Sequence, residues 1–342
     1  MHLPAVLPLR RDVYRLGRAG SNASVAAVAE VWNPLVFPNA LFGEVAIGAT
    51  LYPFFSPWGI LVILPLYGLH ALVLASIVYR FGRPRFETLY LAGVIFGLYE
   101  AYITKIIWNP DWESPIQVGG ISILELLVVV FFWHPFMSFM MAVGTAELLT
   151  SRRKLLPEFV LKRPLLFAMV LGALESSNSP SPVHSFLSLA STLAVILLLV
   201  RWWRNRYEGE NLDDLLPTLG ELKFLVPILL AYYIALGLGI KREAIPGLGA
   251  QAFVWFLYAL TFYLLYRALK KSRGLDVEQT AAPSLRKLVV LSAVWIISGV
   301  AFSTLELFIP ELKFVIIALL WLFGAVVGLV SFFRSAQWAL AE

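Results

Sequence analysis

Long apolar runs separated by short charged stretches dominate this 342-residue chain. Most runs hold about 17 to 25 residues, the length that an α-helix needs to cross the ~30 Å hydrocarbon core of a membrane. Backbone amides and carbonyls inside lipid must be satisfied within their own element, so such runs form helices and not open strands. The pattern therefore predicts an all-α integral membrane protein.

The runs predict about ten transmembrane helices. They cover residues 25–55, 58–79, 86–108, 116–149, 164–175, 185–203, 224–240, 250–269, 288–308 and 314–333. The run 116–149 is too long for one straight span, and His134-Pro135 predicts a kink within it.

The first run, Val25 to Phe55, is the least regular. It is interrupted by two acidic residues and two proline-containing pairs: Glu30, Glu44, Asn33-Pro34 and Pro38-Asn39. Two interpretations stay open. It is either a Pro-broken helix that lines a cavity, or a kinked helix whose acids lie near the two membrane interfaces.

Composition supports the membrane assignment. Hydrophobic residues make up 59% of the chain and charged residues 14%, with a mean hydropathy of +0.78. Soluble domains are roughly half apolar and a quarter charged. There is no cysteine, which excludes disulfides, thiolate metal sites and cysteine nucleophiles. The absence of cysteine and the scarcity of Gln and Met favour a thermophilic source.

The net charge of +5 reflects membrane topology and not a nucleic-acid partner, because the basic residues concentrate in alternate loops. With both termini cytoplasmic, almost all of the 27 Lys and Arg residues lie inside. The exceptions are Lys105, Lys241, Arg242 and Lys313. We therefore expect a multi-pass protein of the plasma membrane, the inner membrane of a bacterial-type cell, in contact with membrane lipids.

The chain begins with a basic stretch, residues 1–24, that carries Arg10, Arg11, Arg15 and Arg18. No apolar region follows it directly, so it is not a cleavable signal peptide. We expect a cytoplasmic arm resting on the membrane surface, followed by one polytopic membrane domain at 25–342. Ten helices permit two five-helix halves of inverted topology, 25–184 and 185–334, as in many secondary transporters. No internal repeat supports the halves.

Three acidic residues fall at membrane depth. Glu100 lies about 21 Å from the inner edge of its run, at about 1.5 Å of rise per residue. By the same rise, Glu125 lies about 10 Å from the outer edge, and Glu175 lies about 16 Å from the inner edge. Ionisable residues inside a membrane are functional candidates by default. The structural alternative is that hydroxyl groups or protonation satisfy them and that they serve helix packing.

The face that carries Glu100 also carries small residues, Gly93, Gly97 and Thr104. Such a stripe lets another helix approach closely, so Glu100 is expected to face protein. Lys105 is about 140° around the helix from Glu100, and we expect its side chain to extend to the outer surface. Gly324 and Gly328 form a GxxxG pair. These small-residue faces permit a homo-oligomer.

The best candidate binding region follows Glu175. The run Ser176 to Pro182, which contains Asn178, cannot continue a regular helix. Unwound backbone at membrane depth is tolerated where it is buried in protein or lines a wet cavity. Serine hydroxyls, the Asn178 amide and carbonyls of this run could bind a small solute or cation. His134 is the histidine best placed for a proton relay, although such histidines are more often packed or hydrogen-bonded.

Several catalytic signatures are absent: a Walker A loop, GxGxxG, HExxH and GxSxG. No cofactor or resident metal is therefore expected. The leading hypothesis is a transporter that couples proton or ion movement to a small solute through Glu100, Glu125 and Glu175. The second is an intramembrane enzyme that acts on a lipid or polyprenyl substrate with Glu and His as acid and base. The third is a non-catalytic membrane subunit or scaffold.

Overall fold

The computed structural model describes residues 33–110, 114–207 and 210–341. The predicted arm at 1–24 and the beginning of the first apolar run lie outside these ranges. In chain order the elements are α3 (Val36–Gly43), η1 (Val45–Ile47), η2 (Gly59–Ile63), α4 (Leu64–Phe81), α5 (Phe86–Thr104), β1 (Gln117–Val118), β2 (Ile121–Ser122), α6 (Ile123–Glu125), η3 (Leu126–Met140), α7 (Met141–Leu149), α8 (Glu158–Lys162), α9 (Pro164–Ser176), α10 (Pro182–Tyr207), α11 (Leu212–Leu215), α12 (Leu219–Gly239), η4 (Arg242–Ala244), α13 (Leu248–Ser272), α14 (Leu285–Glu306) and α15 (Leu312–Leu340).

Seven helices in the described part of the chain are long and apolar enough to cross a membrane. They are Gly59–Phe81, Ile123–Leu149, Pro182–Tyr207, Leu219–Gly239, Leu248–Ser272, Leu285–Glu306 and Leu312–Leu340. The other three predicted runs form α5, which carries Glu87 and Glu100, and the shorter apolar helices Val36–Ile47 and Pro164–Ser176. Large side chains such as Phe256, Phe308 and Leu322 are exposed. An outward apolar surface of this extent suits lipid and not water.

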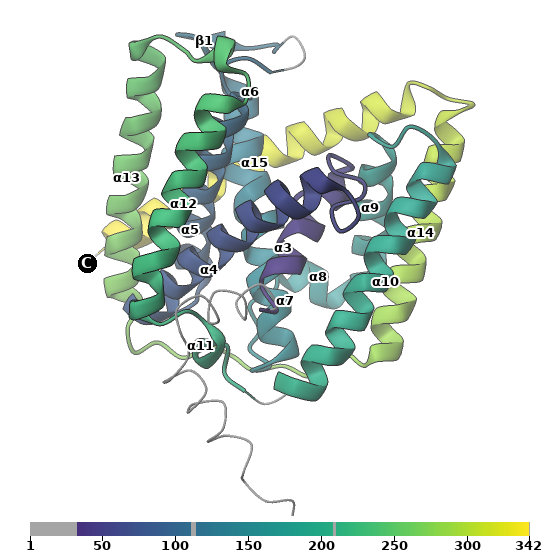
Figure 1. Cartoon of the computed structure of the whole chain (residues 1–342), viewed down its shortest axis with the longest axis horizontal. Helices are drawn as coiled ribbons and strands as arrows, with labels where there is room; N and C mark the ends of the chain where they lie inside the picture. The colour runs from purple at the N-terminus through teal and green to yellow at the C-terminus, as the bar shows by residue number, and fades with distance from the viewer. Residues whose placement is uncertain (1–32, 111–113, 208–209, 342) are drawn as a thin grey trace, which may run out of the picture.

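The helices form two flanking groups around a buried centre (Figure 1). Helices α12 and α13 lie on one side, and α10 and α14 lie on the other, where α14 packs against α9 and α10. Elements α3, α4, α5 and η3 lie between them, and α15 crosses the bundle obliquely from the end of α14 to α13. The core of buried apolar side chains is continuous across all of these elements.

The span Ile123–Leu149 is at the centre of this arrangement. Within its most apolar window 83% of the residues are buried by other protein, against 17% for Leu312–Leu340. Helix α5 is also buried along nearly its whole length. Polar groups on these two elements are therefore surrounded by protein, as the small-residue stripe predicted for Glu100.

Glycine allows α5 and η3 to touch at backbone distance. A Cβ added at Gly93 would lie 2.5 Å from Pro135 Cα, and one added at Gly97 would lie 2.8 Å from Val130 O. Both distances are far below van der Waals contact, so no larger residue fits. The predicted stripe is confirmed, and its partner is the helix that carries His134.

Pro135 lies inside η3, where the sequence predicted a kink, and η3 is a π-helix. Proline has no N–H, so it cannot make the bond to the carbonyl five residues earlier that a π-helix uses. The Tyr90 hydroxyl donates to Phe131 O at 2.8 Å and lies equally close to Gly328 O. Tyr90 of α5 thus adds a side-chain hydrogen bond to the backbone of η3 near the proline.

The GxxxG pair of α15 packs within the chain. A Cβ at Gly324 would lie 2.8 Å from Phe132 Cδ1, and one at Gly328 would lie 2.8 Å from Leu127 O. Together with Gly93 and Gly97, the glycines expected to serve a homo-oligomer therefore contact η3 of the same chain.

The basic loops predicted to lie inside meet at one end of the bundle. Arg80 donates to Pro217 O at 2.7 Å, Lys154 Nζ lies 3.1 Å from Glu278 Oε2, and Arg273 donates to Phe81 O at 3.0 Å. The C-terminus joins them, because Lys271 Nζ donates to Ala341 O at 3.0 Å. We call this end the basic end.

Lys105 departs from its predicted place. Its side chain is fully buried and does not extend to the surface. The ammonium group donates to Ile103 O at 3.0 Å, to Ile240 O at 2.9 Å and also to Gly237 O. It therefore satisfies carbonyls that the ends of α5 and α12 leave free, a role that spacing along one helix could not reveal.

The contact between α5 and η3 predicts that Gly93→Ala lowers the free energy of unfolding by about 1–3 kcal/mol, because the methyl group overlaps the backbone at Pro135. Gly249→Ala is the matched control, since nothing lies within 4 Å of its added Cβ. Denaturation in mixed detergent micelles measures both. Equal stability of the two variants would contradict this packing.

Candidate functional site

Glu44 is a buried carboxylate from the first apolar run. It follows α3, in which every residue is buried, and its own side chain is buried. The Tyr67 hydroxyl donates to Glu44 Oε1 at 2.5 Å, and the Thr50 hydroxyl donates to Glu44 Oε2 at 2.6 Å. Each carboxylate oxygen thus has its own donor, which offsets the cost of removing the acid from water.

Glu100 of α5 and His134 of η3 form a second pair. His134 Nε2 lies 3.0 Å from Glu100 Oε2, and Ser138 Oγ lies 3.1 Å from His134 Nδ1. The exposed fraction is 13% for the Glu100 side chain and 4% for that of His134. If Nε2 donates to the carboxylate, Nδ1 of the neutral ring is free to accept the Ser138 proton.

Tyr67 connects the two pairs. Its ring centroid lies 6.2 Å from that of His134, while its hydroxyl binds Glu44. Glu100 and His134 are close enough to act electrostatically on the Glu44 carboxyl group. We call Glu44, Tyr67, Glu100, His134 and Ser138 the central cluster. It holds two acids, one imidazole and two hydroxyls in the protein interior, a set that can bind a cation or pass a proton.

Glu175 belongs to a second group, the outer cluster, which also contains Ser176, Ser185 and Glu306. Ser185 Oγ donates to Glu175 Oε2, and Ser176 Oγ lies 3.2 Å from Glu306 Oε1. Close packing of helices holds this group together. A Cβ at Gly299 of α14 would lie 3.2 Å from Glu175 Oε2.

The two clusters are linked through one short piece of chain. Gly48 adopts a left-handed backbone, and a Cβ there would lie 2.7 Å from Glu175 O. Asn178 Nδ2 donates to Ile47 O at 2.7 Å. Glu44, only a few residues earlier, binds the central cluster, so a shift of residues 44–48 would be felt at both acid sites.

The predicted site residues therefore separate into three places. Glu100 and His134 meet directly, while Glu175, Ser176 and Asn178 lie together beyond residues 44–48. Glu125 is in neither group. It is fully buried, and Ser114 Oγ donates to its Oε2 at 2.7 Å beside the β1–β2 hairpin.

Sequence reasoning did not identify Tyr67 or Ser138. Tyr67 lies in the apolar run 58–79, where nothing in the sequence distinguishes it. Ser138 follows His134 by one turn, a spacing that could have been noticed. For Glu44 the sequence left open a cavity-lining position and a position near a membrane interface. The structure buries Glu44, and the short elements α3 and η1 are enclosed by protein.

A separate ion-pair network closes the basic end. Arg153 Nη1 lies 3.0 Å from Glu147 Oε1 and 2.8 Å from Asp213 Oδ1, and the Tyr79 hydroxyl donates to the same Glu147 oxygen. The position of Glu147 near the end of the apolar run 116–149 favours a solvated helix end, but its side chain is fully buried. Burial disfavours charge on Arg153, but the Asp213 hydrogen bond and the charge of Glu147 outweigh it and raise the pKa of Arg153.

Among residues 33–110, 114–207 and 210–341, no three His, Asp or Glu side chains are arranged to hold a metal ion. The chemistry visible inside the bundle, among the described residues, is that of carboxylates, the imidazoles of His70 and His134, and hydroxyls.

Taken together, the outward apolar surface and the enclosed polar groups are those of a membrane protein with several apolar helices. Comparison agrees: the chain belongs to a family described as "Uncharacterized membrane protein family", whose model matches residues 36–340. It is also similar to a protein from Archaeoglobus fulgidus described as "Uncharacterized protein". The two are 33% identical over 247 residues, which covers 68% of this chain and 76% of that protein. No solved structure matches the chain.

The basic-end network predicts that Arg153→Gln lowers the free energy of unfolding by about 3 kcal/mol, because it leaves Glu147 buried and unpaired. The neighbouring Lys154→Gln is the control. Its pair with Glu278 is solvated and contributes about 1 kcal/mol or less. Denaturation in mixed micelles gives both values. If both variants lost the same free energy of unfolding, the burial of Glu147 would not explain the stability of the basic end.

Proposed function

We propose that this protein is a transporter that couples the movement of protons or another cation to that of a small solute. The observation that carries the proposal is the central cluster. Two carboxylates and an imidazole from three separate parts of the chain lie in the bundle interior in two hydrogen-bonded groups, Glu44 with Tyr67 and Glu100 with His134. The rings of Tyr67 and His134 bring these groups together, with centroids 6.2 Å apart. Groups of this kind inside a membrane serve ion pathways and proton relays.

The roles follow from the contacts. Glu100 and His134 exchange a proton across their 3.0 Å hydrogen bond, and Glu44 binds the coupling cation or receives the proton through Tyr67. Residues 44–48 carry the state of this site to the outer cluster, where Glu175, Ser176 and Asn178 bind the solute. A broken segment between two sites is a common feature of transporters.

The gathering of basic loops at one end supports an orientation with that end in the cytoplasm, in a multi-pass plasma-membrane protein. The continuous core favours one membrane domain. Elements of 185–334 interleave with those of 25–184, since α14 packs on α9 and α15 on η3. Two halves of inverted topology and a count of ten spans remain predictions.

A specific observation favours an enzyme as the second candidate. Ser138, His134 and Glu100 stand in a row with hydroxyl-to-imidazole and imidazole-to-carboxylate contacts of 3.1 and 3.0 Å. That order of groups activates a serine nucleophile in hydrolases. Against it, Ser138 is fully buried, so a lipid substrate would need the bundle to open.

Binding is the first test of the transporter. A thermal-shift screen with alkali and divalent cations and a panel of small solutes is expected to find a stabilising ligand, since a ligand present at 100 times its Kd adds about 2.7 kcal/mol. The shift should vanish in Glu100→Gln and persist in Glu311→Gln, an exposed acid. If nothing binds and Glu100→Gln is as stable as wild type, the cluster serves packing and the scaffold hypothesis gains.

Flux is the second test. In proteoliposomes with an imposed pH gradient, the wild type is expected to accumulate the solute found in the screen. Glu44→Gln and Glu100→Gln should reduce accumulation to background, because neither retains an ionisable acid at its position. Glu311→Gln is expected to accumulate the solute normally. Undiminished accumulation in both glutamine variants would refute coupling through the central cluster.

Ser138→Ala separates the two candidates. A transporter needs no nucleophile here, so we expect the variant to keep most of its flux. An enzyme would lose turnover entirely, and its wild type would be labelled at Ser138 by a fluorophosphonate probe. Peptide mapping of the labelled protein shows whether Ser138 carries the probe. Ser284→Ala, which changes an exposed serine, is the control variant.

A further inference from the structure

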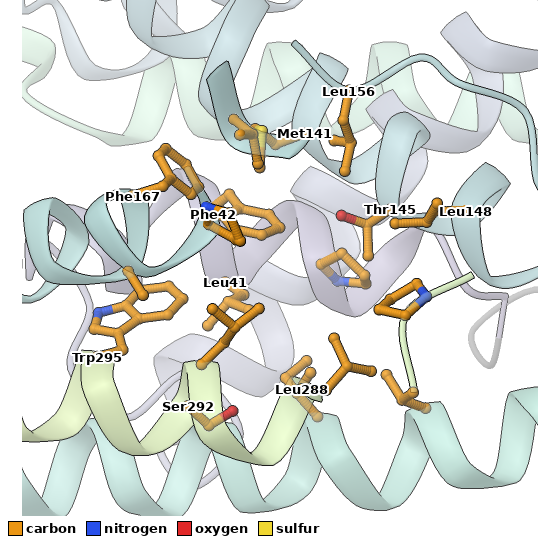
Figure 2. A pocket seen from close by; sticks show the side chains of 18 of the residues that line it. Leu41, Phe42, Met141, Thr145, Leu148, Leu156, Phe167, Leu288, Ser292 and Trp295 are labelled. Atoms are coloured by element: carbon orange, nitrogen blue, oxygen red, sulfur yellow. The ribbon is translucent and has the colours of Figure 1, made fainter. Parts of the chain in front are cut away.

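An apolar cavity of about 190 Å³ lies apart from both acid clusters. Side chains from α3, α7, α8, α9, α10 and α14 line it, among them Leu41, Phe42, Phe167, Leu193, Leu288 and Trp295. Figure 2 shows Leu288, Ser292 and Trp295 along one face of α14, with Phe42 and Thr145 across the space from them. Neither proposed mechanism uses this cavity.

The mostly apolar lining favours a hydrocarbon occupant over water. Among the described residues its polar side-chain groups are those of Thr145, Lys287 and Ser292 and the indole N–H of Trp295, while a buried water needs two to four polar partners. A protein cavity of about 150 Å³ with a similar apolar lining stays dry and binds benzene. A space of this size therefore suits part of an alkyl or isoprenoid chain.

The cavity is elongated along α14. Lys287, Leu291 and Trp295 lie on successive turns and span about 12 Å at about 1.5 Å per residue. The far end is closed by Phe42 and Trp295, whose rings stack with centroids 6.2 Å apart. The near end reaches Lys287 in the first turn of α14 and Pro283 in the loop before it.

Positive charge surrounds the near end. Lys287 is exposed and lies in the first turn of α14, where the helix dipole also favours an anion. Arg204 donates to Pro283 O at 3.1 Å, and Arg163 directly precedes the lining residue Pro164. The nearby acid Glu158 is ion-paired with Lys162 at 2.9 Å, and the hydrogen bond from Lys162 lowers the pKa of that carboxyl.

We propose that this cavity holds one hydrocarbon chain of an anionic membrane phospholipid, whose phosphate binds Lys287 at the basic end. The apolar lining of the cavity matches the hydrocarbon chain, and Lys287 at its mouth matches the phosphate. A phospholipid is favoured over a free solute because the mouth lies at the basic end, where headgroup phosphates of that leaflet would be.

A photolabelling experiment tests the assignment. The full-length protein in nanodiscs is exposed to phosphatidylglycerol with a diazirine in one acyl chain, and labelled residues are mapped by mass spectrometry. Label is expected on cavity-facing residues such as Leu193, Leu197 and Leu291. It should exceed the label obtained with the zwitterionic phosphatidylcholine analogue.

Two variants sharpen the test. Lys287→Gln should reduce cavity labelling roughly threefold, since an exposed charge contact contributes up to about 1 kcal/mol, whereas Lys270→Gln at the same end should not. Ala168→Phe, which fills the cavity, should reduce labelling there to background, whereas Ala235→Phe on the exposed face of α12 should not. Lys287→Gln removes only an exposed side chain, so the test stands even if Ala168→Phe fails to fold.

The proposal is overturned if label falls equally on the outward faces of α12 and α13, or if phosphatidylcholine labels the cavity as strongly as phosphatidylglycerol. If a diazirine fatty acid labelled the cavity as strongly as phosphatidylglycerol, the ligand would be a single-chain acid and not a phospholipid. Neither result bears on the central cluster, because the cavity variants leave Glu44, Glu100 and His134 unchanged.

Discussion

The contact between α5 and η3 determines the rest of this structure. Glycines on α5 bring its backbone against Pro135, and the π-helical turn around that proline places His134 beside Glu100. Tyr90 of α5 adds a hydrogen bond from its hydroxyl to the backbone of η3 at Phe131 O. The close packing surrounds the polar groups with protein, and the hydrogen bond between Glu100 and His134 fixes the two helices relative to each other.

The enclosed segment 36–48 connects the central cluster to the outer cluster. Near its end, Glu44 accepts a hydrogen bond from Tyr67 in the central cluster. Gly48 packs closely against the backbone at Glu175. Buried carboxylates are held here by hydroxyl and imidazole partners, while the guanidinium of Arg153 neutralises Glu147 at the basic end.

Much of the fold could be predicted because lipid imposes simple rules on composition. Most apolar runs marked the helices within a few residues, although the run 25–55 corresponds only to the short Val36–Ile47 among the described residues. Charge placed the basic loops at one end. The site was harder. Spacing identified Glu100 as facing protein, but only three-dimensional packing shows that His134 meets it and that Tyr67 brings in Glu44. Lys105 and Glu147 were misplaced because their partners, Gly237 and Arg153 among them, come from other elements.

The proposed transport requires that the central cluster be reached from each side of the membrane in turn, and the absence of native cysteine allows a direct measurement. A single cysteine replaces the buried Ser138, and an impermeant thiol reagent is applied to either side of sealed proteoliposomes. The account predicts labelling from each side, with rates that shift in opposite directions when the pH gradient is reversed. Labelling from neither side, or from one side whatever the gradient, would contradict it.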